Sequence, residues 1–309
     1  MKKEVFTCSD GKDLVYRVWA PEEGEILFTV HILHGMAEHS MRYDRFADYL
    51  STLGAAVYAQ DHRGHGQSAT EGGLGYFASK DGWSRVVLDS LEISQMVQGI
   101  HPEVPHFLFG HSMGSFIARS LMIDHSHFYD GVILSGTAAD KGLLAKVGRL
   151  IAVTKSRFNG GRKPDPLLDN LSFGSFAKHF PDRKTDFDWL SRDEDQVRKY
   201  NDDPLCGFIC TSRFFVDLLD GIALANDESK ASRIRSDLPL FLISGEDDPV
   251  GDFGKGVRKV YEEYQKAGIR DLRMNLVLEG RHELLNETNY RDIYATIGNW
   301  LTEHMVKGR

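Results

Sequence analysis

The stretch Gly110-His111-Ser112-Met113-Gly114 decides the fold that this sequence predicts. A glycine two residues to either side of a serine allows a turn sharp enough to expose the serine hydroxyl. The five residues alone are a weak signal, because a glycine-rich turn can also simply join a strand to a helix. Residues 105–109 have the apolar pattern of a short buried strand, and residues 115–122 have the pattern of a helix. This order of strand, serine turn and helix predicts that Ser112 is a nucleophile.

A serine hydroxyl becomes a good nucleophile only when a base removes its proton and a third group orients that base. An apolar run at 239–244 leads into Gly245-Glu246-Asp247-Asp248-Pro249-Val250, which offers three carboxylates. A second run at 273–278 leads into Glu279-Gly280-Arg281-His282-Glu283, which predicts His282 as the base. The order serine, acid, histidine, each just past a strand, is typical of the α/β-hydrolase fold.

The residues alone leave the choice among the three carboxylates open. Pro249 biases Asp248 toward an extended backbone, which suits a side chain that must reach out of a loop. Charged loop residues are more often simply solvated, so this argument is modest.

Acyl transfer also requires two backbone N–H groups that face the negative charge on the carbonyl oxygen, each worth about 10²–10³ in rate. One is predicted to come from Met113, directly after Ser112. The other is predicted to come from Met36, in the turn after a strand at 28–33. Only the backbone of each methionine has this role, and their side chains are expected to line the acyl pocket.

The remaining pattern predicts one α/β domain with an insertion. About eight strands alternate with helices, which implies a mostly parallel sheet covered by helices on both sides. Helical spacing of apolar residues appears at 46–53, 257–264 and 293–301. We therefore expect residues 1–139 and 236–309 to form the hydrolase core.

Residues 140–235 lack strand-like runs and are expected to form a helical lid over the carboxyl ends of the strands. The lid begins with an apolar stripe that includes Leu143 and Val147, with lysines and arginines beside it. This stripe could contact substrate in an acyl channel, rest on a membrane surface, or only pack on its own domain. Cys206 and Cys210 are expected to face each other on a lid helix, as a packed reduced pair or as a redox switch.

The composition limits the kinds of partner that we expect for this protein. A net charge of −8 disfavours nucleic acid, since phosphate binding needs a concentrated basic surface. The sequence has no apolar run near 18 residues, and its first residues lack the apolar core of a signal peptide. We expect a cytoplasmic protein, peripheral to the membrane if the lid contacts lipid. Three cysteines without a secretion signal argue against a disulfide framework.

No cofactor is expected. His62 and His65 lie in one turn, but no further ligand completes a known metal spacing around them, so no metal is predicted.

These motifs resemble those of monoacylglycerol lipases and bacterial lysophospholipases, a family of α/β-hydrolases that also groups with certain serine aminopeptidases. The resemblance is carried by His34-Gly35-Met36-Ala37-Glu38-His39, by Asp61-His62-Arg63-Gly64-His65-Gly66-Gln67-Ser68, and by the three segments around the expected nucleophile, acid and base. It implies that Ser112 is the nucleophile, Asp248 the acid and His282 the base. It also implies that the amides of Met36 and Met113 bind the oxyanion.

The resemblance implies hydrolysis of a small-molecule or single-chain lipid ester, namely a monoacylglycerol or a lysophospholipid, through an acyl-enzyme. Alternatives are a small-ester carboxylesterase, an aminopeptidase on the same scaffold, and a binding protein that has kept the fold. Glu38 and Arg42 are expected near the polar head of the substrate, or else as an ion pair that braces the loop. The family often has glycine where Ala37 stands, a change that could tighten the oxyanion loop.

Overall fold

The computed structural model describes residues 1–69, 73–158 and 160–305. Within these residues a single sheet has eight strands in the order β1-β2-β4-β3-β5-β6-β7-β8. Their bounds are β1 Lys2–Thr7, β2 Asp13–Trp19, β3 Phe28–Leu33, β4 Ala55–Gln60, β5 His106–His111, β6 Gly131–Ser135, β7 Leu240–Gly245 and β8 Leu272–Val277. β1 and β2 pair antiparallel with their neighbours, and the pairs from β4 to β8 are parallel. This arrangement confirms the predicted mostly parallel sheet.

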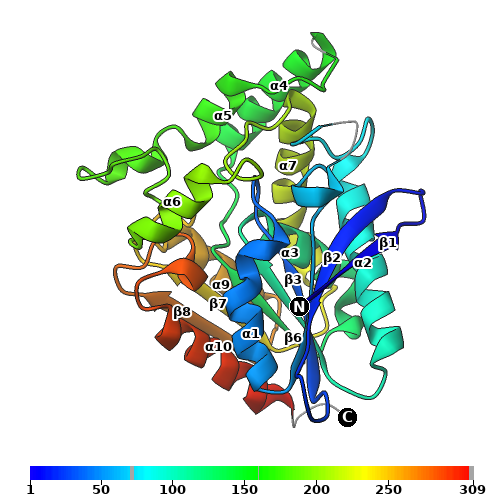
Figure 1. Ribbon diagram of the computed structural model, residues 1–309. Coiled ribbons are helices and arrows are strands. Elements are labelled where there is room, and N and C mark those ends of the chain that lie inside the picture. The colour runs from blue at the N-terminus through cyan, green and yellow to red at the C-terminus, as the bar shows by residue number, and fades with distance from the viewer. Residues whose placement is uncertain (70–72, 159, 306–309) are drawn as a thin grey trace.

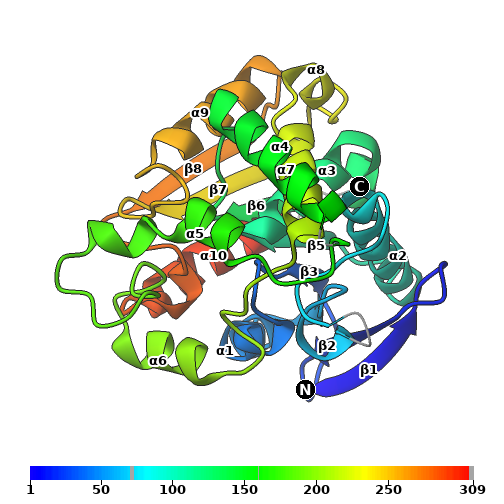
Figure 2. The ribbon, with the colours of Figure 1, turned by 90° about the horizontal axis from the view of Figure 1, so that it is seen from above.

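Helices cover both faces of the sheet, because each carries one apolar face (Figure 2). On one face, α1 and α10 pack against strand residues such as Val30 and Phe107. On the other face, α2, α3 and α9 pack against strand residues such as Leu108 and Leu134. The bounds are α1 Asp44–Thr52, α2 Gly82–Ile100, α3 Met113–His125, α9 Lys255–Lys266 and α10 Tyr290–Met305. The helical spacing at 46–53, 257–264 and 293–301 is thus realised in α1, α9 and α10.

The segment between β6 and β7, here called the insertion (residues 140–235), is helical. It contains α4 Leu143–Phe158, α5 Pro166–Phe173, α6 Glu194–Asp202, α7 Ser212–Ala225 and α8 Glu228–Ala231. α7 packs on α3 of the core, and α4 packs on α7. Figure 1 shows α4, α5 and α6 together at one end of the molecule, beyond the sheet.

Short 3₁₀ helices lie in the connections: η1 Ser40–Tyr43, η2 Gly66–Ser68, η3 Ser126–Phe128, η4 Phe176–His179 and η5 Leu284–Asn286. No helix in the described part of the chain is long and apolar enough to cross a membrane.

The prediction that Cys206 and Cys210 share a helix is wrong. Both lie in the loop between α6 and α7, each as a buried free thiol. Cys206 packs in a small cluster with Leu190 and Tyr200, whereas Cys210 belongs to the main core. Pro204 and Gly207, which disfavour helix, stand in this loop and explain why the helical spacing of the two cysteines is not realised.

Candidate active site

Ser112 lies at the turn between β5 and α3, in a backbone conformation that side chains rarely adopt. Its φ is 52° and its ψ is −117°. A Cβ atom on Gly110 would lie 2.4 Å from the carbonyl oxygen of Gly114, and one on Gly114 would lie 2.0 Å from the carbonyl oxygen of Leu33. The two glycines are therefore required because neighbouring backbone leaves no room for a side chain. The strain at Ser112 is compatible with function, since such conformations persist where the surrounding structure enforces them.

The sharp turn brings the backbone of Ser112 against the neighbouring strand. The Ser112 N–H donates to the carbonyl oxygen of Ser135 at 2.9 Å, at the carboxyl end of β6. α3 begins at the next residue, Met113, so the amide of Met113 belongs to the first turn of the helix. N–H groups in a first turn have no partner within the helix and can bind an oxyanion.

Asp248 and His282 are in hydrogen-bond contact although 34 positions separate them. The Nδ1–H of His282 donates to Oδ2 of Asp248 at 2.9 Å, which leaves Nε2 unprotonated and able to accept a proton. The other carboxylate oxygen, Oδ1, accepts from the N–H of Val250 at 2.8 Å. Both side chains come from loops at the carboxyl ends of adjacent parallel strands, β7 and β8.

The same geometry distinguishes Asp248 from its neighbours. Asp248 is fully buried (0% exposed), whereas Asp247 is exposed and Glu246 is only partly buried. Of the three carboxylates, only Asp248 contacts a histidine in the described chain. The sequence argument from Pro249 favoured the same residue.

The electrostatics of His282 suit a general base. Burial by itself lowers the pKa of this imidazole, but the charge of Asp248 and its hydrogen bond outweigh burial and raise the pKa above its ordinary value of 6.5. Glu283 and Glu38 act in the same direction. The charged form of His282, which arises when it takes a proton from a nucleophile, is therefore stabilised.

Two aromatic rings hold His282 in place. Its ring centroid lies 4.7 Å from that of His111, the residue before Ser112, and 5.2 Å from that of Trp189 in the insertion. Burial lowers the pKa of His111 to about 4, with the charge on His282 acting in the same direction, so His111 is neutral at pH 7. Sequence reasoning missed both contacts, because nothing in the local pattern around His111 or Trp189 reveals a packing partner from another segment.

Within the described residues, no hydrogen bond joins Ser112 to His282. Contacts between a nucleophile and its base are often long in the absence of substrate and tighten when it binds. His111 adjoins Ser112, so its contact with His282 brings the His282 ring close to the turn that carries Ser112.

The second expected oxyanion donor, Met36, lies in a tight turn after β3. Met36 is partly buried and its neighbour Ala37 has a φ of 53°, a value that favours glycine. The carbonyl oxygen of Ala37 accepts from the hydroxyl of Tyr200 at 3.0 Å and from the N–H of Gly207 at 2.9 Å. The insertion thus holds the turn that carries the Met36 amide.

Glu38 and Arg42 form an ion-pair network within the protein. Arg42 Nη1 donates to Glu38 Oε2 at 2.8 Å, and the same guanidinium forms two hydrogen bonds with the carboxylate of Glu283. The other Glu38 oxygen accepts from the N–H of Gly35 at 2.5 Å and from the hydroxyl of Tyr43 at 2.9 Å. These contacts favour the bracing interpretation of Glu38 and Arg42 over direct contact with substrate.

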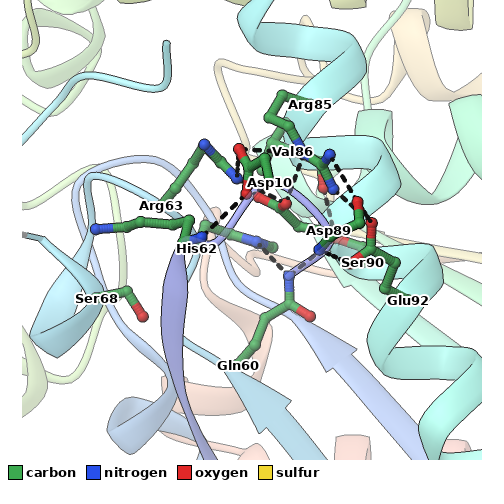
Figure 3. A network of polar contacts seen from close by, with 12 residues as sticks. Asp10, Gln60, His62, Arg63, Ser68, Arg85, Val86, Asp89, Ser90 and Glu92 are labelled. Carbon is green, nitrogen blue, oxygen red and sulfur yellow. Dashed lines mark hydrogen bonds and ion pairs between the residues drawn. The ribbon is translucent and has the colours of Figure 1, made fainter. Parts of the chain in front are cut away.

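The segment Asp61–Ser68 packs beside the turn that carries Met36, here called the oxyanion turn, and contacts the residue that leads into it. The N–H of His62 donates to Nε2 of His34, and Gln60 donates to Nδ1 of His62. Figure 3 shows Gln60 and His62, and beside them the guanidinium groups of Arg63 and Arg85, which both bind the carboxylate of Asp89. The motif that resembles the family's strand-end turn therefore has a structural role, since it fixes His34 ahead of Met36.

Leu143 and Val147, the proposed substrate contacts in the insertion, lie on the surface of α4. Leu143 is 76% exposed and Val147 is 49% exposed. Leu144 and Leu150 on the same helix are also exposed, whereas Ala152 is buried against the rest of the protein. The interpretation that this helix only packs on its own domain does not account for so much exposed apolar surface.

Comparisons with known proteins agree with this geometry. Residues 24–289 match the model of the family described as serine aminopeptidase, S33. Monoglyceride lipase from Rattus norvegicus is 33% identical over 79% of this chain and 72% of its own length, and monoacylglycerol lipase from Mycolicibacterium smegmatis is 27% identical over 97% and 96%. The crystal structure of a carboxyl esterase from Bacillus coagulans in complex with glycerol superposes with a TM-score of 0.91 at 27% identity, over 99% of both chains. The chain belongs to the serine aminopeptidase S33 family of α/β-hydrolases.

Proposed function

We propose that this protein is a serine hydrolase that cleaves carboxylic esters of single-chain lipids, with monoacylglycerols as the preferred class and lysophospholipids next. The observation that carries the proposal is the buried hydrogen bond from His282 to Asp248, which forms near the strained turn that carries Ser112. The relatives named as monoglyceride lipases support the substrate class.

The proposed reaction begins when Nε2 of His282 takes the proton of the Ser112 hydroxyl. The bond from Ser112 Oγ to the ester carbonyl carbon forms, and the amides of Met36 and Met113 bind the oxyanion. The bond to the glycerol oxygen then breaks, and His282 gives its proton to that leaving oxygen. Water repeats the sequence on the acyl-enzyme and releases the fatty acid. No step requires a cofactor.

We propose a secondary role for the insertion, residues 140–235, as a lid whose α4 rests on a lipid surface. Four exposed apolar side chains on α4 (Leu143, Leu144, Val147 and Leu150) lie with basic residues on the same helix. Such a helix can bind at the interface of a membrane. Vesicle flotation should show binding that falls when Leu144 and Leu150 are both changed to aspartate, and that persists when exposed Leu278, on the β8 side, is changed instead.

An aminopeptidase remains the rival activity because of the family's name. It would need a free carboxylate to bind a substrate amine, but Glu38 and Glu283 near the oxyanion turn are both paired with Arg42. This pairing favours the esterase.

The test is hydrolysis of a chain-length series of monoacylglycerols, lysophosphatidylcholine, p-nitrophenyl esters and aminoacyl anilides, by the protein and by Ser112→Ala. Turnover that depends on Ser112 and is highest on monoacylglycerols would support the proposal. Turnover of short esters only would indicate a small-ester carboxylesterase, and turnover of anilides alone a peptidase. Labelling of Ser112 by a fluorophosphonate would separate any of these enzymes from a binding protein.

A further inference from the structure

Three side chains of metal-binding type meet between the core and the insertion. They are separate from Ser112, Asp248 and His282, here called the proposed triad. His39 follows the oxyanion turn, and Asp203 and Cys206 lie in the loop between α6 and α7. One ligand atom from each lies within 4.8 Å of the other two. We propose that His39, Asp203 and Cys206 bind one divalent cation of the zinc class, which joins the insertion to the oxyanion turn.

The ligand set indicates the kind of cation. A thiolate, an imidazole and a carboxylate together suit Zn²⁺ and disfavour Mg²⁺ and Ca²⁺, which prefer oxygen ligands. Tetrahedral zinc with ordinary bond lengths places ligand atoms about 3.3–3.7 Å apart. A pair of ligand atoms at the 4.8 Å limit must therefore close by about 1 Å, whereas His39 Nε2 and Asp203 Oδ2, which are 2.9 Å apart, must separate slightly. Side-chain rotation can supply both movements. Three protein ligands leave a fourth position for water, and the side chain of Asp203 is 32% exposed, which gives the cation a path from solvent.

The site is held in place by contacts that do not need the cation. The N–H of Leu205 donates to Oδ1 of Asp203 at 2.8 Å, so that Oδ2 is directed to His39 Nε2 at 2.9 Å. The N–H of Cys206 donates to the carbonyl oxygen of Asp203 at 2.9 Å and closes the turn that carries both ligands. Binding would replace the contact between His39 and Asp203 by two bonds to the metal, while the Leu205 contact continues to orient the carboxylate.

The charges that face the site favour a cation. Three carboxylates act on the Cys206 thiol, those of Glu38, Asp203 and Glu283, and the guanidinium of Arg42 opposes them. Arg42 is itself paired with Glu38 and Glu283. Two negative charges are left in excess, which a divalent cation would compensate.

The test is titration of the chelator-treated protein with Co²⁺, followed by competition with Zn²⁺. We expect one equivalent of Co²⁺ to bind and to give a thiolate-to-cobalt absorption band in the near ultraviolet, which Zn²⁺ abolishes. Cys206→Ser should lose the band. The matched control is Cys210→Ser, since Cys210 is also a buried free thiol but lies outside the cluster, and it should keep the band.

Asp203→Asn is the second variant, because the partly exposed Asp203 can be changed with little risk to folding. It should bind Zn²⁺ at least about tenfold more weakly, with an unchanged melting temperature in the absence of metal. Absence of saturable binding, or equal binding by the protein, Cys206→Ser and Asp203→Asn, would overturn the proposal.

Two further variants separate this site from the proposed triad. Ser112→Ala and His282→Gln should both bind one equivalent with the thiolate band, whether or not the protein proves to be an esterase. Loss of Co²⁺ binding in His282→Gln with its retention in Cys206→Ser would place the cation at the triad and would refute the proposal.

Discussion

The guanidinium of Arg42 forms a two-pronged ion pair with the carboxylate of Glu283, the residue that directly follows His282. The contact between Nη2 and Oε2 is 2.6 Å, and both side chains are largely buried. Arg42 also binds Glu38, whose carboxylate holds the N–H of Gly35. One arginine therefore links the turn that carries Met36 to the loop that carries the proposed base.

This link predicts that Glu283→Gln loses activity although Glu283 does not take part in proton transfer. Without the charge of Glu283, Arg42 keeps one ionic partner, Glu38, and the link between the oxyanion turn and the His282 loop is weakened. We expect kcat on a monoacylglycerol to fall about 10–100-fold with a smaller change in KM, measured by steady-state kinetics. The matched control is Glu92→Gln, since Glu92 pairs with Arg85 and lies away from the His282 loop. An equal loss of kcat in both variants would argue against a specific link.

The same ion pair should make stability depend on pH in the acidic range. Burial would raise the pKa of Glu283, but Arg42 outweighs it and lowers the pKa from 4.5 to about 2. A lowered carboxyl pKa contributes stability that is present above pH 4.5 and is lost as the pH falls toward 2. Thermal unfolding should show the protein more stable than Glu283→Gln at pH 6, with the difference narrowing below pH 4.5. A stability difference that stays constant over this pH range would mean that the ion pair between Glu283 and Arg42 does not cause the difference.

The choice of Asp248 as the acid is tested by comparison with its neighbour. Asp248→Asn should reduce kcat by about 10³–10⁴, because an amide holds the histidine in the wrong tautomer. Asp247→Asn should remain within about twofold of the parent, since Asp247 is exposed. Equal activity of the two variants in an ester hydrolysis assay would contradict the assignment.

Activity should also report the raised pKa of His282. Burial lowers this pKa, but Asp248 raises it above 6.5 on balance. The base must be neutral to act, so kcat/KM should rise with pH to a plateau, with the midpoint above 6.5. Residual activity of Asp248→Asn should have its midpoint at a lower pH, because burial still lowers the pKa while the largest effect that raises it is removed. A midpoint that stays in place would assign the titration to another group.

Ala37 carries backbone strain that glycine would relieve. Its φ of 53° costs an L-residue about 1–2 kcal/mol, whereas glycine adopts it freely. After the greater entropy of glycine in the unfolded chain is subtracted, Ala37→Gly should stabilise the protein by up to about 1 kcal/mol. Buried Ala138, which has no positive φ, is the control, and Ala138→Gly should destabilise it. Thermal unfolding at fixed pH measures both, and a lower melting temperature for Ala37→Gly would refute the strain argument.

Much of the fold followed from local pattern. The strand at 28–33 matches β3 in both bounds, and the helical spacing from Phe46 to Leu53 corresponds to α1, with Gly54 at a φ of 90° just beyond it. Such features depend on the alternation of apolar residues and on glycine conformation, which neighbours in sequence decide. The prediction of a helix that carries Cys206 and Cys210 was wrong because spacing alone was weighed, without Pro204 just before the two cysteines and Gly207 between them.

The sequence by itself determined the sharp turn at Ser112, the order of serine, acid and histidine, and the alternation of strands and helices that leads to the sheet. These depend on residues close together in the chain, and the glycines at 110 and 114 can be recognised from their positions alone. Only the tertiary structure decided which groups surround the proposed base. His282 meets Trp189 and His111, Arg42 meets Glu283, and His39 meets Asp203 and Cys206, because the parallel sheet and the insertion bring their loops to one end of the molecule. Contacts across 93 to 241 positions leave no local periodicity, so the pattern of neighbouring residues could not have revealed them.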